Sequence, residues 1–461
     1  MTGGGPVAPP LWIKDPLAIL GDDAERGLVV ERGRIIELVA EGCDPQTTQG
    51  RKFETFDASA HVVLPGLINA HHHFYQNLTR AHPDAINRPL FGWLRALYPV
   101  WAHLTPDMIA LSSELALAEL LLSGTTCASD HHYLFTDALG EALAIEAATA
   151  RELGIRVHLT RGSMSLSEDD GGLPPRTVVQ GDDAILSDCA ASVAALHESG
   201  EGAMVQIALA PCSPFSVSES LMAETAVLAR SLGVRLHTHL AETEDENEFC
   251  LDRFGVRPVD YLERTGWLGD DVWLAHGIFF DDDEIARLGS AGAGIAHCPS
   301  SNMVLASGVC PVPALEAAGV AVGLGVDGSA SNDASNMIQE VRQALLLQKL
   351  HHGAGTIDHI DALGWATTGS ARCLGRDDLG RIAVGKQADL ALFRLDELRF
   401  SGAGDPLAAL VLCGASGADA VMVGGTWRLR DGVIPGLDLE RLIARHGAAA
   451  SDLLAAAGGR F

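Results

Sequence analysis

The feature that most constrains the fold of this chain is a repeated alternation of short apolar runs and helical stretches through its middle. The helical pattern Thr136–Leu153, for example, is followed by the strand-like run Ile155–Thr160, and the pattern Glu219–Leu232 by Val234–His239. The alternation covers about 300 residues, somewhat more than the ~250 residues typical of a (β/α)₈ barrel. We therefore predict an α/β protein whose parallel strands close into a barrel.

The rival architecture for such a pattern is an open, doubly wound sheet. That fold usually carries a G-x-G-x-x-G turn between its first strand and the following helix. The literal match here, Gly323 to Gly328, comes late in the chain and lies within a strand-like run. The sequence therefore favours the barrel.

The two ends of the chain differ from the middle. Residues 11–64 and 388–429 both consist of short strand-like runs separated by turns, so they can pair into one small sheet domain. A chain of 461 residues is also too long for one ordinary core. We predict a β-sandwich built from residues 1–65 and 371–461, and a catalytic barrel from residues 66–370.

Charge and composition exclude several classes of partner. The net charge of −28 repels phosphate groups, which argues against nucleic acids and anionic membranes. No apolar run reaches transmembrane length, and no N-terminal secretion signal is present. The nine cysteines are scattered without a C-x-x-C pair, as expected for reduced thiols. We expect a cytoplasmic protein; an exposed apolar helix over Met108–Leu122 would be compatible with a homo-oligomer.

The first chemical signal is a histidine cluster that follows the apolar run at residues 62–64. Successive side chains of a strand point to opposite faces, so His71 and His73 point one way and His72 the other. Two imidazoles side by side at a strand end provide half of a zinc site. The alternative is a polar, histidine-rich turn.

A second strand-like run ends in His237 and His239, and Glu242 follows three residues later. A metal ion needs a third ligand, and activation of water needs a nearby acid or base. Either histidine could be the ligand by the alternation argument, and Glu242 could be the acid or base.

Two further strand-like runs also end in polar residues. His276 closes the run at 273–276, where a buried, packed histidine is the alternative, and Asp327 follows the run at 322–326. Because the carboxyl ends of barrel strands meet on one face, these residues are expected to lie together with the histidines.

Lysines are rare, and none falls in the central strands. They occur at Lys14, Lys52, Lys349 and Lys386. A carbamylated lysine that bridges two metal ions therefore has no candidate between His73 and Asp327. We predict one metal ion.

Together these motifs resemble the amidohydrolase superfamily, in its single-metal deaminase branch, and residues 380–390 look like its recurrent return strand. The resemblance implies one divalent ion, zinc, and a hydrolytic deamination that yields a ring carbonyl and ammonia. It implies that Glu242 moves protons, that His276 polarises the attacking water, and that Asp327 also passes a proton to the amine. The implied zinc ligands are His71, His73, His239 and Asp327.

Three segments, at residues 74–80, 161–167 and 297–303, are similar to the 8-oxoguanine deaminases and the related hydroxyatrazine hydrolases. This resemblance implies a small heterocyclic amine as substrate, with 8-oxoguanine converted to urate. Guanine and alkylamino-triazines are the alternative substrates. A metal-free scaffold protein is the alternative outside enzymes.

Four residues are candidates for binding that substrate. Gln76 offers both a donor and an acceptor to an amide edge, and Arg161 offers donors to a ring carbonyl. A surface helix position for Gln76 and a structural salt bridge for Arg161 are the alternatives. Trp93 could cover the flat ring from a lid, or serve core packing, and Asn302 could contact the ring from its loop.

Overall fold

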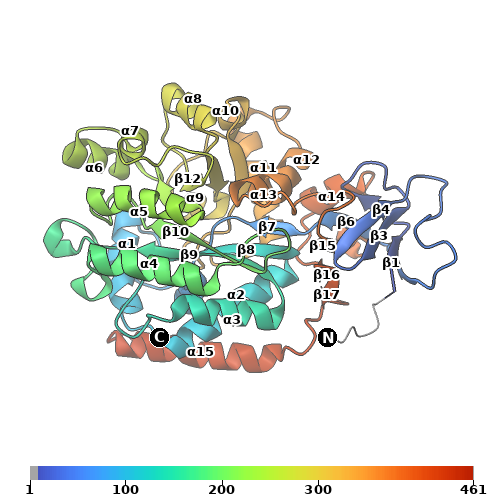
Figure 1. Cartoon of the computed structure of the whole chain (residues 1–461), viewed down its shortest axis with the longest axis horizontal. Helices are drawn as coiled ribbons and strands as arrows, with labels where there is room; N and C mark the ends of the chain where they lie inside the picture. Colours follow the sequence, from blue (N-terminus) through green and yellow to red (C-terminus); the bar gives the residue numbers. More distant parts are fainter. Residues whose placement is uncertain (1–8, 460–461) are drawn as a thin grey trace.

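The structure, a computed structural model, describes residues 9–459 (Figure 1). Residues 1–8 and 460–461, the outermost parts of the predicted sandwich segments, lie outside this range. Eight parallel strands pair in chain order, and the amide of Ala70 donates to the carbonyl of Leu324 at 2.8 Å where the last strand meets the first. The predicted (β/α)₈ barrel is confirmed. Its strands are β7 (Leu67–Asn69), β8 (Thr125–His132), β9 (Arg156–Ser163), β10 (Val205–Pro211), β11 (Leu236–Leu240), β12 (Val272–His276), β13 (Gly294–His297) and β14 (Ala321–Leu324).

Glycines with positive φ let helices end and the chain turn back into the barrel. Gly154 (φ 71°) ends α3 (Ala142–Leu153), and Gly233 (φ 69°) ends α5 (Glu219–Leu232). A residue with a side chain is strained in this conformation, which explains glycine at these turns. The helix α3 begins at Ala142 rather than at the predicted Thr136, because the preceding residues form a loop at the barrel mouth.

The remaining helices surround the barrel or connect its strands. They are α1 (Leu90–Trp101), α2 (Pro106–Leu122), α4 (Asp182–Leu196), α6 (Glu244–Phe254), α7 (Pro258–Arg264), α8 (Asp282–Ala291), α9 (Pro299–Val304), α10 (Val312–Ala317), α11 (Met337–His352), α12 (His359–Gly364), α13 (Ser370–Cys373), α14 (Pro406–Leu412), α15 (Leu439–Ala456), and the short helices η1 (Phe74–Thr79), η2 (Glu168–Asp170), η3 (Arg176–Val178), η4 (Trp365–Gly369) and η5 (Leu398–Phe400).

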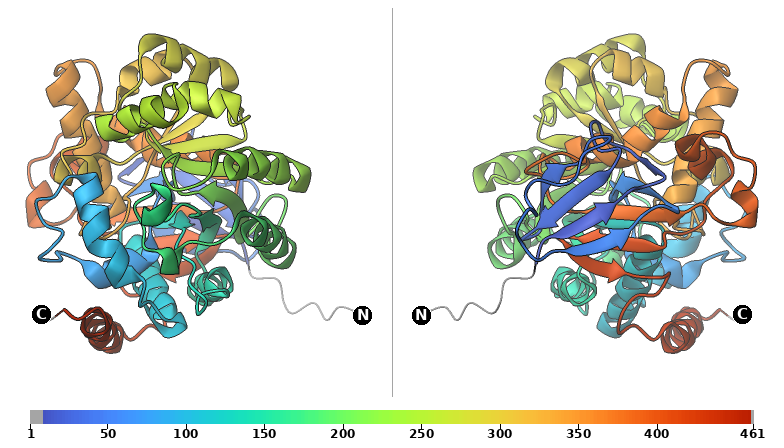
Figure 2. Two further views of the ribbon diagram at one scale, coloured as in Figure 1. Left: turned by 90° about the vertical axis from the view of Figure 1, so that its left-hand side faces the viewer. Right: turned by 90° about the vertical axis from the view of Figure 1, so that its right-hand side faces the viewer.

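Strands from both ends of the chain build the predicted sandwich, as the blue and orange strands in the right-hand view of Figure 2 show. One sheet has the order β4-β3-β1-β5 and the other β17-β16-β15-β6-β2. Buried apolar side chains such as Ile13, Val63 and Leu390 fill the space between them. The strands are β1 (Leu11–Lys14), β2 (Ala18–Ile19), β3 (Gly27–Glu31), β4 (Arg34–Leu38), β5 (Glu54–Asp57), β6 (His61–Pro65), β15 (Leu390–Arg394), β16 (Ala420–Val423) and β17 (Thr426–Leu429).

A buried ion pair joins the two parts of the molecule. Arg156, at the start of β9, donates from Nε and Nη2 to the carboxylate of Asp389 at 2.8 and 3.0 Å, and the same carboxylate accepts from the amide of Gly424 at 2.7 Å.

The helices α12, η4 and α13 follow one another without a break across residue 370. The exact domain boundaries at 65/66 and 370/371 stay a prediction.

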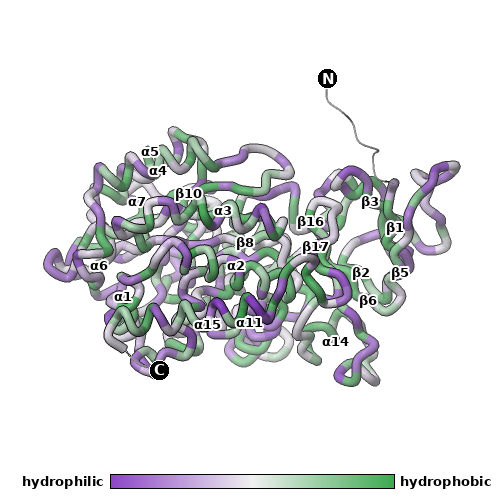
Figure 3. The backbone as a smooth tube through the Cα atoms, turned by 90° about the horizontal axis from the view of Figure 1, so that it is seen from below, coloured by the Kyte–Doolittle hydropathy of each residue, from purple (hydrophilic) through white to green (hydrophobic). Residues whose placement is uncertain are grey.

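The helix α2 is buried on most of its surface, so the expectation of an exposed apolar helix is wrong. The C-terminal helix α15 covers it with a face that includes Leu442, Ala449 and Leu453. In Figure 3 hydrophobic and hydrophilic residues alternate along α15, as expected for a helix with one buried face. In the described residues 9–459, no helix is long and apolar enough to cross a membrane.

Candidate metal centre and active-site cavity

Hydrogen bonds from backbone amides hold together the proposed ligands from the two ends of the barrel sheet. The side-chain oxygen of Asn69 accepts from the amide of Val326 at 3.0 Å, and the amide of Asp327 donates to the carbonyl of His71 at 3.0 Å. Asp327 and His276 both have positive φ, 62° and 73°. Such strained residues at strand ends are typical of functional sites.

Four side chains bring their donor atoms together at this point. Oδ1 of Asp327 lies 3.2 Å from Nε2 of His71 and 3.3 Å from Nε2 of His73. Nε2 of His73 lies 3.1 Å from Nε2 of His239. Ligands of one tetrahedral zinc ion, with bonds of about 2.05 Å, are separated by about 3.3 Å. The spacing therefore suits a single ion.

Hydrogen bonds on the far sides of two rings show which nitrogen atoms carry lone pairs. Nδ1 of His73 donates to the carbonyl of His131 at 2.7 Å, and Nδ1 of His239 donates to the carbonyl of Cys212 at 2.6 Å. In neutral imidazole the other nitrogen then has no hydrogen. The two Nε2 atoms thus face each other with lone pairs, an arrangement that a cation between them stabilises.

His237 plays a different part from His239. Its Nδ1 donates to the carbonyl of Trp273 at 2.8 Å, so its Nε2 accepts from Nδ1 of His71, also at 2.8 Å. This leaves Nε2 of His71 as a buried lone pair without a hydrogen-bond partner. His237 therefore orients His71. The sequence left open whether His237 or His239 is the ligand, and these hydrogen bonds favour His239.

Burial keeps the imidazoles of His71 and His239 neutral. It lowers the pKa of His239 to about 3 and the pKa of His71 well below its usual range. Neutral imidazole is the form that binds metal ions.

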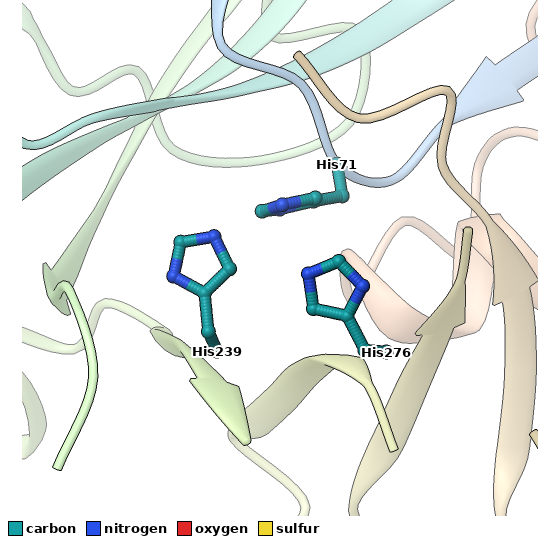
Figure 4. Close-up of side chains that lie close together, drawn as sticks. All are labelled: His71, His239 and His276. Atoms are coloured by element: carbon teal, nitrogen blue, oxygen red, sulfur yellow. The ribbon is translucent and has the colours of Figure 1, made fainter. Parts of the chain in front are cut away.

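Glu242 and His276 lie beside this cluster. Nε2 of His276 is 3.4 Å from the carboxylate of Glu242, and Nδ1 of His276 accepts from the amide nitrogen of Asn302 at 3.0 Å. Nε2 of His276 therefore carries the hydrogen and acts as a donor. Figure 4 shows the rings of His71, His239 and His276 turned toward a common space. Burial, strengthened by the charge of Asp327, raises the pKa of Glu242 well above its usual value.

A narrow cavity of about 30 Å³ opens above these groups. Gln76 and Trp93 both line it. Gln76 is 1% exposed and its Oε1 has no partner, so the alternative of a surface position is wrong. Trp93 is fixed by a hydrogen bond from Nε1 to the carbonyl of Ala330 at 2.9 Å. The full lining is His73, Gln76, Leu90, Trp93, Leu94, Tyr98, Tyr133, Cys212, Phe215, His239, Glu242, His276, Leu305, Asp327 and Ser331.

Two predicted substrate contacts do not line this cavity. The guanidinium of Arg161 donates to Asp188 at 2.5 Å and to Gln180 at 2.8 Å, and it lies 3.5 Å from the ring centre of Phe135. This is the structural salt bridge that was the alternative, because a buried guanidinium needs partners for its charge. Asn302, on α9, donates to His276 instead of lining the cavity.

Several polar residues of the cavity were not predicted. Tyr133 directly follows β8 and Cys212 directly follows β10. The same reasoning about strand ends would have found both of them. Tyr98 comes from α1, where one aromatic residue among several carries no distinguishing signal.

Comparison with known proteins places this site in a family. The sequence profile described as "Amidohydrolase family" matches residues 62–428. The chain belongs to the amidohydrolase family. It is 62% identical over 447 residues to an 8-oxoguanine deaminase from Pseudomonas aeruginosa, covering 96% of this chain and 99% of that protein. It is 40% identical to a hydroxydechloroatrazine ethylaminohydrolase from a Pseudomonas species, over 85% of this chain and 82% of the relative.

The fold of this amidohydrolase is also similar to a solved structure. An atrazine chlorohydrolase from Arthrobacter aurescens TC1, complexed with zinc, superposes with a TM-score of 0.89 at 30% identity. The superposition covers 95% of this chain and all (100%) of the other. Barrel and sandwich are thus both shared.

Proposed function

We propose that this amidohydrolase is a hydrolytic deaminase that converts 8-oxoguanine and water to urate and ammonia. The observation that carries the choice of substrate is the 62% identity to the 8-oxoguanine deaminase over nearly the full length of both chains. The cavity agrees with a flat, polar heterocycle, because Trp93 and Phe215 provide aromatic walls and Gln76 an unpartnered amide oxygen.

The same proposal includes one divalent metal ion, zinc, held by four side chains. Its support is the set of facing lone pairs, the neutral imidazoles and the zinc-complexed structural relative. When bound, zinc lowers the pKa of water toward ~7 and so provides the nucleophile at neutral pH. The ligands would be His71, His73, His239 and Asp327.

The side chains beside the ligands would move the protons. Glu242, whose pKa is raised by burial, holds a proton more readily than a free carboxyl and donates it to a ring nitrogen next to the amino-bearing carbon. The Nε2 hydrogen of His276 donates to the oxygen of the attacking water. Asp327 accepts one proton from that water and passes it to the departing amine, which leaves as ammonia. The remaining hydroxyl proton returns to Glu242 as the ring carbonyl forms.

Gln76 would recognise the amide edge of the ring. Its Oε1 accepts from a ring N–H and its Nε2, 3.4 Å from the hydroxyl of Tyr133, can donate to a carbonyl. A ligand without such an edge leaves this buried amide unpaired, which costs affinity. The fixed indole of Trp93 would stack on the ring face.

Ammonia release from the zinc-loaded protein tests the proposal, with 8-oxoguanine, guanine and an alkylamino-hydroxytriazine offered separately. Ultraviolet spectra identify each product. We expect the highest kcat/KM with 8-oxoguanine. Faster turnover of the triazine would overturn the substrate, and no ammonia from any of them with zinc bound would overturn the deaminase. A chain that retains no zinc would revive the scaffold alternative.

We also propose a cytoplasmic location. All nine cysteines lie within the described residues as free thiols, and seven of them are buried. Thiols persist in the reducing cytoplasm. A homo-oligomer stays a prediction that light scattering can test.

A further inference from the structure

A second group of buried titratable side chains lies outside the barrel lumen, behind the proposed ligand His73. Asp130 and His132 share one face of β8, and Glu146 reaches them from α3. Their exposed fractions are 0, 0 and 1%. Donor atoms of the three lie within 4.8 Å of one another, and none of the three lines the cavity.

The end of β8 holds the segment that carries His73 through three hydrogen bonds. The carboxylate of Asp130 accepts from the amide of Phe74 at 2.6 Å. The amide of His131 donates to the carbonyl of His72 at 2.7 Å, and the carbonyl of His131 accepts from Nδ1 of His73, also at 2.7 Å. The backbone on both sides of His73 and its ring are therefore fixed by consecutive residues of one strand.

His132 and Glu146 fix this strand end from the outside. Nε2 of His132 donates to the carbonyl of Leu134 at 2.9 Å, and Nδ1 lies 2.8 Å from Oε1 of Glu146. That separation is an ordinary hydrogen bond. Because Nε2 carries the hydrogen, Nδ1 accepts from the Glu146 carboxyl, whose pKa is raised by burial. Both ring nitrogens are thus engaged, which favours a hydrogen-bonded network over a second metal site.

We propose that Asp130, His132 and Glu146 form a positioning network that keeps residues 72–74 in the geometry in which Nε2 of His73 points at the metal. The inference rests on the proposed metal centre. The network touches neither substrate nor metal. It acts on the ligand through the backbone amide of Phe74 and through His131. Loss of the network should therefore weaken metal binding more than it slows the reaction of the metal-loaded enzyme.

Zinc affinity of two shape-conserving variants tests the network. Asp130→Leu removes the acceptor for the amide of Phe74, and Glu146→Met removes the hydrogen-bond partner of His132, each with a side chain of similar size. We expect each variant to bind zinc about 10–100-fold more weakly, measured by competition with a chromophoric chelator. At saturating zinc, kcat should recover to within a few-fold of the wild-type value.

Asp389→Asn is the matched control. This variant breaks the buried ion pair between Asp389 and Arg156, which lies at the start of β9 and not at the strand ends beside His73. It should lower the melting temperature without changing zinc affinity. Wild-type affinity in both network variants would overturn the proposal, as would equal weakening in the control. Two zinc equivalents in the wild type and one in the variants would make the cluster a metal site instead. Wild-type protein that retains no zinc would overturn the metal centre, and the network with it.

Discussion

The proposed function divides metal binding and proton transfer among single residues at the base of the cavity. Glu242→Gln keeps the size of the side chain but removes its ability to donate and accept a proton. We expect kcat to fall by about 10²–10⁴-fold while zinc content stays unchanged. Steady-state assays with metal analysis check this. Glu244→Gln, on the exposed start of α6, is the control; a kcat for Glu242→Gln close to wild type would contradict the assigned role.

Glu246 gives the stability of the protein a pH dependence. Burial raises its pKa to about 7, and its Oε1 has no partner. An unfolded glutamate has a pKa of about 4.3. Below that pH both states bind the proton; as pH rises toward 7 the unfolded state releases it first, so stability falls.

Glu246→Gln removes this titration. Between pH 5 and pH 8 the variant should gain on the order of 2–4 kcal/mol relative to wild type. Urea denaturation of both proteins at the two pH values measures the difference. Parallel pH profiles would show that Glu246 does not titrate in the folded protein.

Residue patterns predicted the candidate ligands because alternation along a strand is a local property. His71 and His73 follow β7, which ends at Asn69, and the closure of the barrel brings both of them to Asp327. Arg161 shows the limit of such reasoning. Its partners Asp188 and Gln180 come from α4 and the loop before it, and no local pattern in the sequence marks that contact.

At the scale of elements, the C-terminal helix α15 is connected to the cavity through η1. Nε2 of His446 donates to Oδ1 of Asn77 at 2.8 Å, and Nδ2 of Asn77 donates to the carbonyl of Ser112 at 2.8 Å. Asn77 directly follows Gln76, which lines the cavity. The helix thus supports the part of the wall that would recognise the substrate.

His446→Ala should leave the amide oxygen of Asn77 unpaired. We expect a loss of about 1–3 kcal/mol in unfolding free energy and a higher KM, because Gln76 loses support. Chemical denaturation and steady-state kinetics test both effects. His351→Ala, on the exposed end of α11, should change neither; an unchanged KM in His446→Ala would restrict α15 to a structural role.

Helices and strands were predicted where the hydrophobic periodicity ends at a glycine, as it does for α5, Gly233 and the strand that follows. The composition of the alanine- and glycine-rich segment at residues 447–459 did not lead us to predict a helix, although alanine has the highest helix propensity. Its burial against α2 depends on a contact between residues more than 300 positions apart in the chain, which no local pattern contains.

At the scale of the whole molecule, the architecture follows from burial on both faces of a parallel sheet and from the pairing of the two chain ends. The β6–β15 pair joins residues 61–65 to 390–394, so the sandwich closes only when both ends are present. The first barrel strand β7 continues from the sandwich strand β6, and the metal centre lies where the first and last barrel strands meet.

Metal removal should consequently lower the stability of the whole molecule, not only its activity. Without a cation, the lone pairs of His73 and His239 face each other at 3.1 Å in a buried site, which is unfavourable. A ligand that binds only the folded state stabilises it by about 4 kcal/mol at 1,000 times its Kd. Calorimetry of chelator-treated protein should show a melting temperature several degrees below that of the zinc-loaded form. Zinc should restore it, whereas calcium, which prefers oxygen ligands, should not; equal melting temperatures with and without zinc would mean that these histidines do not form a metal centre.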